Sequence, residues 1–201
     1  MIDETLPWLT FPAAVDLSNT IVVTPGCDID LLRTDEQLDV WIAAERGRIA
    51  CVEAASGRLP DVRALRANLR ALLYAYAEDR PLPERPRRRI NTLSATAPAY
   101  PVITTGAGQA IKHASQDPYA IFAAEVARSA IALIGSDDQT LSVCTAPSCG
   151  LLYPPDDPRQ LWCCKACGNR ARVARHAARH RTRRPSPAPS RTTRHPSRSR
   201  P

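Results

Sequence analysis

The sequence has few aromatic residues and no long apolar run. Phe, Trp and Tyr make up only 5% of its 201 residues, so a packed interior must consist mainly of Leu, Ile, Val and Ala. No stretch reaches the ~18 consecutive apolar residues that indicate a transmembrane helix, so we expect no membrane span. The chain also starts without an apolar signal segment, which gives no indication of an oxidising compartment. We therefore expect a cytoplasmic protein.

Acidic residues are missing from the last part of the chain. Residues 1–157 contain 14 Lys and Arg and all 20 Asp and Glu, a net charge of −6. Residues 158–201 contain 13 Lys and Arg and no acid, a net charge of +13. This asymmetry is typical of a basic module that binds a polyanion, attached to an ordinary acidic domain. A solubilising tail is the alternative, but it explains only residues 185–201 well.

The groups that would indicate an enzyme are missing too. The sequence offers no Ser/His/Asp set and no paired catalytic carboxylates, and His113 has no Ser or Cys partner. The segment Gly106-Ala107-Gly108 is not followed by a helix in the place that a dinucleotide-binding loop requires. We therefore predict no catalytic residues and no enzymatic activity.

What the sequence does contain is a dense group of cysteines. Five of the seven lie within residues 144–167. Cys144 and Cys149 form one close pair, Cys163 and Cys167 form another, and 13 residues separate the pairs. Each pair ends in Cys-Gly, and Gly permits a positive φ at such a turn. Two pairs of thiolates on short turns are the ligand set of a tetrahedral structural Zn²⁺, which leaves no coordination position open for catalysis.

Other uses of these residues stay open. The thiols can form a disulfide pair or remain idle, and Cys164 can replace Cys163 as a ligand. His176 and His180 have an H-x3-H spacing and can join Cys164 and Cys167. That arrangement is short for a ββα finger and leaves the first cysteine pair without a metal. We therefore expect both histidines on a helix surface.

The second cysteine pair lies in the sequence W-C-x3-C-G-N-R, which begins at Trp162. This motif, with a preceding C-x4-C, resembles the CGNR zinc finger. The resemblance implies one structural zinc and Cys163 as the third ligand, although Cys164 stands where the family often carries a small residue. Members of that family usually have an N-terminal ABATE domain, described as a stress-induced transcription regulator. The segment AVDLSNTI at residues 14–21 resembles its entry motif, so the resemblance implies DNA binding and transcription control. The implied zinc ligands are Cys144, Cys149, Cys163 and Cys167.

The first 137 residues are predicted to form a mainly α domain with one β-hairpin. Apolar residues at spacings of three and four predict a helix over about 61–78, with Arg63, Arg66 and Arg70 off the apolar stripe on a solvated face. Asp117 as N-cap and the following proline predict a helix that Gly135 ends. β-branched residues around the glycines predict a hairpin over about 100–113.

Two polar residues of the entry motif, Asp16 and Asn19, would lie one helical turn apart. They can line a ligand pocket, or they can fix the chain locally through hydrogen bonds. We expect this domain to bury its own core and to contribute no zinc ligand.

A basic helix is predicted directly after Cys167. Asn169 can cap it, several alanines favour it, and its arginines recur every three or four residues on one stripe without any acid. Such a stripe favours a polyanion, which can be DNA or RNA, and an acidic protein partner is a third possibility. The preference for DNA over RNA is what the family resemblance implies. The predicted nucleic-acid contacts are Arg170, Arg172, Arg175, Arg179 and Arg183.

The predicted organisation therefore has three parts. Residues 1–137 form the ABATE-like domain, and residues 140–183 form a finger of ribbon-like knuckles followed by the basic helix. Leu152 and Trp162 are expected to form the small core of the finger. Residues 184–201 contain almost only Arg, Pro, Ser and Thr, so we predict a disordered basic tail.

Overall fold

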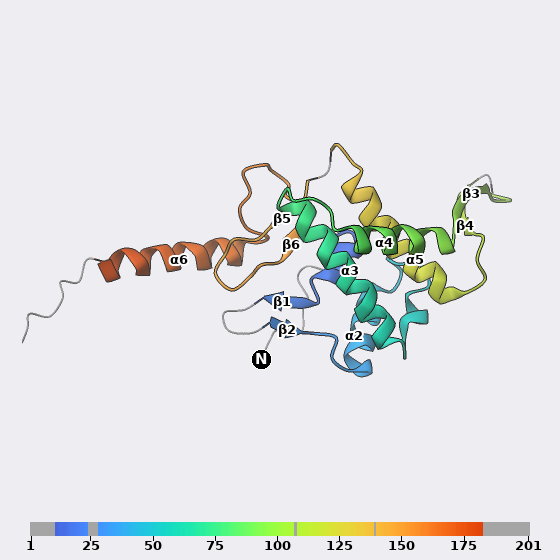
Figure 1. Cartoon of the computed structure of the whole chain (residues 1–201), viewed down its shortest axis with the longest axis horizontal. Helices are drawn as coiled ribbons and strands as arrows, with labels where there is room; N and C mark the ends of the chain where they lie inside the picture. The colour runs from blue at the N-terminus through green and yellow to red at the C-terminus, as the bar shows by residue number, and fades with distance from the viewer. Residues whose placement is uncertain (1–10, 24–27, 107, 139, 183–201) are drawn as a thin grey trace, which may run out of the picture.

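The computed structural model describes residues 11–23, 28–106, 108–138 and 140–182 (Figure 1). Its helices are α1 (Ala13–Ser18), α2 (Asp35–Glu45), the 3₁₀ helix η1 (Val52–Ala55), α3 (Leu59–Ala77), α4 (Glu84–Thr96), α5 (Pro118–Ile134) and α6 (Lys165–Thr182). Its antiparallel hairpins pair β1 (Ile21–Val23) with β2 (Asp28–Asp30), β3 (Ala99–Ile103) with β4 (Gln109–His113), and β5 (Ser142–Val143) with β6 (Leu152–Tyr153). Arg183 and the predicted tail lie outside the described residues.

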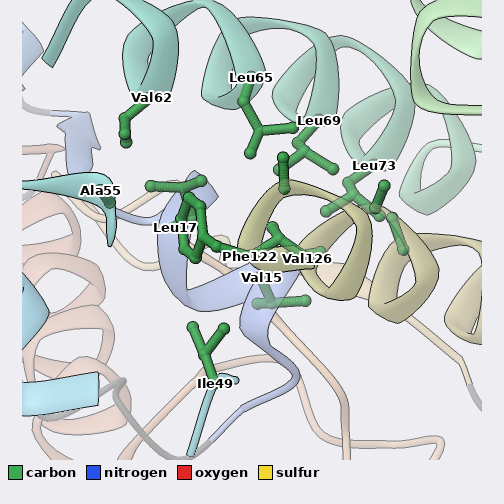
Figure 2. Close-up of a cluster of buried hydrophobic side chains, with 14 of the residues drawn as sticks. Val15, Leu17, Ile49, Ala55, Val62, Leu65, Leu69, Leu73, Phe122 and Val126 are labelled. Carbon is green, nitrogen blue, oxygen red and sulfur yellow. The ribbon is translucent and has the colours of Figure 1, made fainter. Parts of the chain in front are cut away.

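The core of the N-terminal part is made mainly by α1, α2, α3 and α5, and α4 adds one buried residue, Ile90. Leu65, Leu69 and Leu73 recur every four residues on α3, and Figure 2 shows them facing Phe122 and Val126 of α5. The predicted mainly α domain with a β3–β4 hairpin is therefore confirmed. The α4 helix buries only Ile90 and exposes its arginines.

The predicted cap of α5 is present. The side chain of Asp117 accepts a hydrogen bond from Tyr119 N at 2.9 Å, and Pro118 occupies the first helical position, where no backbone donor is needed. At α2, the hydroxyl of Thr34 likewise accepts from Gln37 N at 3.4 Å. These local signals fix where the helices begin.

Two of the three arginines of α3, Arg66 and Arg70, do not lie on a solvated face, so the expectation was wrong for them, whereas Arg63 is exposed as expected. The guanidinium of Arg66, 3% exposed, donates two hydrogen bonds of 2.7 Å to the carboxylate of Asp30 in β2. Arg70 donates to the carbonyl oxygens of Ser18 and Ile21 at 2.7 and 3.3 Å, and Arg63 lies 3.4 Å from Asp30. The two partly or fully buried arginines hold the β1–β2 hairpin against α3.

The carboxylate of Asp16 is fully buried beside a second buried acid, Glu45. Nη1 of Arg48 lies 2.9 Å from Asp16 Oδ2 and 2.8 Å from Glu45 Oε2. Burial, together with the charge of Glu45, raises the pKa of Asp16 to about 8. Burial raises the pKa of Glu45 as well. One arginine therefore faces two acids that prefer to hold a proton.

This pair predicts a pH dependence of stability. A carboxyl whose pKa is higher in the folded than in the unfolded chain stabilises the fold below its unfolded pKa of about 4, and this stability is lost as the pH rises through about 8. The urea midpoint of the zinc-loaded protein should fall between about pH 6 and about pH 9, and Asp16→Asn should flatten that fall. Asp79→Asn, at an exposed acid, is the control. An unchanged slope in Asp16→Asn would contradict the assignment.

The zinc-finger region shares its packing with the N-terminal helices. Leu152 of β6 is 0% exposed and belongs to the same core as α1 and α3. Nδ2 of Asn19 donates to the carbonyl of Leu152 at 2.9 Å, and Oδ1 of Asn19 accepts from its N–H at 3.0 Å. The hydroxyl of Tyr74 donates to Gly150 O at 2.6 Å. The expectation that Leu152 belongs to a separate finger core was therefore wrong, because β6 turns this side chain towards the helices.

Asp16 and Asn19 thus both make protein contacts in the interior. Asn19 joins α1 to β6, and Asp16 accepts a hydrogen bond from Phe11 N at 3.3 Å in addition to its contact with Arg48. These are the contacts of residues that fix the chain locally. That the two residues line a ligand pocket stays a prediction.

Candidate metal centre and nucleic-acid interface

Four cysteine sulfurs converge between the β5–β6 region and the start of α6. The Sγ atoms of Cys144, Cys149, Cys163 and Cys167 all lie within 4.8 Å of one another. Two of the separations, Cys149–Cys163 and Cys163–Cys167, are 3.6 and 3.5 Å. Sulfurs about 2.3 Å from a tetrahedral zinc ion are separated by about 3.8 Å, so the group fits one Zn²⁺. The predicted cofactor, one structural zinc, is confirmed by this group.

The backbone forms a tight turn around the first cysteine pair. Gly150 has a φ of 64°, in the left-handed region that favours glycine. Its N–H donates to Cys144 O at 3.2 Å, and Cys149 N donates to Ala146 O at 3.1 Å. The sequence Cys-Gly therefore closes the turn that brings Cys144 and Cys149 together.

The glycine after the second pair has a different role. A Cβ at Gly168 would lie 3.1 Å from Cε3 of Trp162, so the absent side chain lets the first turn of α6 approach the indole ring. Trp162 is half-buried against the cysteine cluster, as a structural residue would be. The α6 helix is thus attached to the finger both by Cys167 and by this ring.

Charge explains why the four sulfurs require a cation. The thiol of Cys163, through a hydrogen bond, lowers the pKa of Cys149 to about 5, whereas that same contact raises the pKa of Cys163. Sulfurs so close cannot all become thiolates unless a cation offsets their repulsion. Arg170 contributes part of this charge, because its Nη2 donates to Cys167 Sγ at 3.0 Å. Arg170 therefore belongs to the basic helix α6 but directs its guanidinium towards the metal site.

The alternative ligands lie outside this group. Cys164 is exposed, while the sulfur of its neighbour Cys163 points into the cluster. The six described cysteines are all free thiols, so no disulfide is present among them. His176 and His180 are exposed residues of α6, further along the helix than Cys167.

The α6 helix projects from the rest of the molecule, as Figure 1 shows at the left of the view. Ala171 is buried and Ala174 is half-buried, but every described side chain from Arg175 to His180 is exposed. Since only the root of the helix packs on the finger, its outer turns are open to a partner on several sides.

Two adjoining grooves follow the root of α6. A groove of about 450 Å³ is lined by Arg172, Arg175, Ala178 and Arg179. A more apolar groove of about 430 Å³ shares Arg175 and Ala178 and continues to Leu161 and Trp162. The guanidinium of Arg175 lies 5.6 Å from the centroid of the Trp162 ring, where the two grooves meet. Three of the predicted contact arginines are thus neighbours, whereas Arg170 is bound to sulfur.

The fold and the site define a mainly helical protein with one structural zinc finger. Residues 12–137 match the ABATE family, described as a putative stress-induced transcription regulator, and residues 140–180 match the CGNR zinc finger. The chain therefore belongs to the ABATE family and carries a CGNR zinc finger, which confirms the resemblance that its motifs implied. No curated protein matches the chain. In the described part of the chain, no helix is both long and apolar enough to cross a membrane.

Proposed function

We propose that this protein is a DNA-binding transcription regulator that acts in the cytoplasm, and that its zinc finger presents α6 to duplex DNA. The observation that carries the proposal is the projecting helix with Arg172, Arg175 and Arg179 exposed and no acid among its residues. A helix that served only as a solvated surface would normally mix acids with its arginines. An acid-free row of arginines gains most from a partner that supplies phosphates.

The dimensions of α6 favour DNA over RNA. Residues 175–182 extend beyond the half-buried Ala174, so this part of α6 can present a whole helix, which is about 10–12 Å across with its side chains. The major groove of B-DNA is about 12 Å wide and admits a helix, whereas A-form RNA has a deep, narrow major groove that side chains cannot read. Within this proposal the arginines contact phosphates and base edges from the groove.

We also propose Cys144, Cys149, Cys163 and Cys167 as the zinc ligands, and the choice between the adjacent cysteines is testable. Cys163→Ser should lower the zinc content from about one ion per chain towards zero, because its sulfur lies inside the group of four. Cys164→Ser should keep the ion, because that thiol is exposed. Metal analysis of the two purified variants gives the answer. The opposite pair of results would move the third ligand to Cys164.

A zinc-stabilised protein-interaction module is the second candidate. The apolar groove beside Arg175 favours it, because Leu161 at its rim is 56% exposed and an acidic peptide with apolar residues would fit both grooves. Fluorescence anisotropy with duplex DNA, duplex RNA and an acidic amphipathic peptide separates the candidates. We expect the tightest binding to DNA. Tighter binding to RNA or to the peptide would reject the proposal, and sequencing DNA that co-purifies at low salt would identify the preferred sites.

A further inference from the structure

The α6 helix carries a second set of metal-ligating side chains that the zinc finger does not use. His176 and His180 are exposed and lie one helical turn apart. Their Nε2 atoms are 3.1 Å apart and their ring centroids are 4.3 Å apart. The nearest zinc ligand in sequence, Cys167, is nine residues before His176, or about 14 Å along the helix axis. The histidines are therefore a separate pair of potential ligands.

We propose that His176 and His180 together chelate a second, exchangeable divalent ion of the class that imidazole prefers, namely Zn²⁺, Ni²⁺ or Cu²⁺. Two nitrogens that are 3.1 Å apart and each about 2.0–2.1 Å from one ion subtend an angle of about 100° at that ion. This angle lies between the values of square-planar and tetrahedral coordination, which these ions adopt. The helix holds the two rings on one face at the i and i+4 positions, so the chelating arrangement exists before the ion arrives.

A hydrogen bond between two neutral rings would also explain the close nitrogens. In that case the Nε2–H of one ring donates a hydrogen bond to the unprotonated Nε2 of the other, and the contact needs no ion. The two explanations predict different results when metal is added. Only a chelate site would bind an ion, and that binding would require both histidines. A metal titration therefore separates them.

The charges around the pair indicate when the ion binds best. Arg172, Arg175 and Arg179 lie within one turn of the histidines along the helix, and each guanidinium repels a divalent cation. Phosphates would relieve this repulsion, and two protein ligands leave coordination positions that a phosphate oxygen or a base nitrogen can occupy. The ion and DNA should therefore strengthen each other's binding by the same factor. This coupling rests on the proposed function, whereas the site itself does not.

The test is a calorimetric titration of the full-length, zinc-loaded protein with Ni²⁺. The parent should bind about one further ion per chain, and His176→Ala or His180→Ala should abolish that binding while the structural zinc stays in place. The matched control is His180→Ala combined with Arg181→His, which keeps two histidines but moves one of them about 100° around the helix. Absence of a second ion in the parent, or its retention in either single variant or the control, would overturn the site.

The second arm measures duplex-DNA affinity with and without Ni²⁺. We expect an increase of roughly fivefold or more in the parent and none in His176→Ala. An equal effect of Ni²⁺ in both proteins, or no effect in the parent, would overturn the coupling. If neither protein binds DNA under any condition, the proposed function fails, while the calorimetric result still decides the metal site.

Discussion

Cys149→Ser is expected to unfold most of the chain, and not the zinc finger alone. The variant loses one of the four zinc ligands. A zinc finger of this size is too small to fold without its metal ion. Structural zinc contributes about 10–16 kcal/mol in isolated finger peptides, as much as or more than the total stability of an ordinary domain, about 5–15 kcal/mol. The finger should therefore not survive the loss of its ion.

The helices should follow because they share a core with the finger. Removing β6 would take the fully buried Leu152 out of the main core and leave the amide of Asn19 without either hydrogen-bond partner. An unsatisfied buried polar group costs about 1–3 kcal/mol, and a lost buried leucine costs about 2–5 kcal/mol. Together these losses reach a large part of the stability of a single domain.

Circular dichroism and thermal melting of the variant and of the parent in chelator measure this effect. We expect a strongly lowered helical melting transition in both, whereas Cys164→Ser, with its exposed thiol, should melt like the parent. A helical transition that stays at the parental temperature after zinc is lost would show that residues 1–137 fold on their own, as the sequence suggested. Asn19→Ala should give an intermediate result, because it breaks the two hydrogen bonds to β6 but leaves the zinc site intact.

The parts of the fold that the sequence predicted depend on local signals. The helix of α3 follows from leucines spaced by four, and the start of α5 follows from Asp117 and the proline after it. The zinc site was predictable because two cysteine pairs on short turns require only that the turns face each other. In each case the residues that cause the structure are neighbours in the chain.

The parts that the sequence did not predict depend on contacts between distant residues. Arg66 is buried because Asp30, 36 residues away, accepts two hydrogen bonds from its guanidinium. Leu152 enters the helical core because Asn19, 133 residues away, binds the backbone of β6. The β1 and β2 strands have three residues each, too few for an alternating pattern to appear.

Loss of the exposed arginines of α6 is the second large effect that we expect. A triple variant combines three alanine substitutions, at Arg172, Arg175 and Arg179. These side chains lie around one groove, and none of the three is part of the zinc site. If each of the three substitutions removes at least about 1 kcal/mol of binding free energy, the affinity for duplex DNA should fall on the order of a hundredfold. The plot of log K against log salt should also become less steep by about 0.9 for each lost phosphate contact.

The single substitutions distinguish two kinds of contact. If Arg172 binds only phosphate, Arg172→Ala should weaken all DNA sequences alike and reduce the salt slope by about one. Arg175 is held near the Trp162 ring, so its guanidinium has a more fixed position from which to read a base. If it reads a guanine, Arg175→Ala should cost about 1–3 kcal/mol on preferred sites and flatten the sequence preference.

The triple variant is decisive only if its zinc finger is intact. It also needs a control protein that loses the same number of positive charges at another place on the surface. Metal analysis should therefore still give about one zinc per chain. A control on α4 removes the same number of positive charges from exposed positions, Arg85, Arg87 and Arg88. If net charge alone attracted DNA, the two triple variants would weaken binding equally; if α6 is the contact surface, the control should stay close to the parent. A zinc-loaded α6 variant that binds DNA as tightly as the parent would remove α6 from the DNA interface and favour the protein-interaction module.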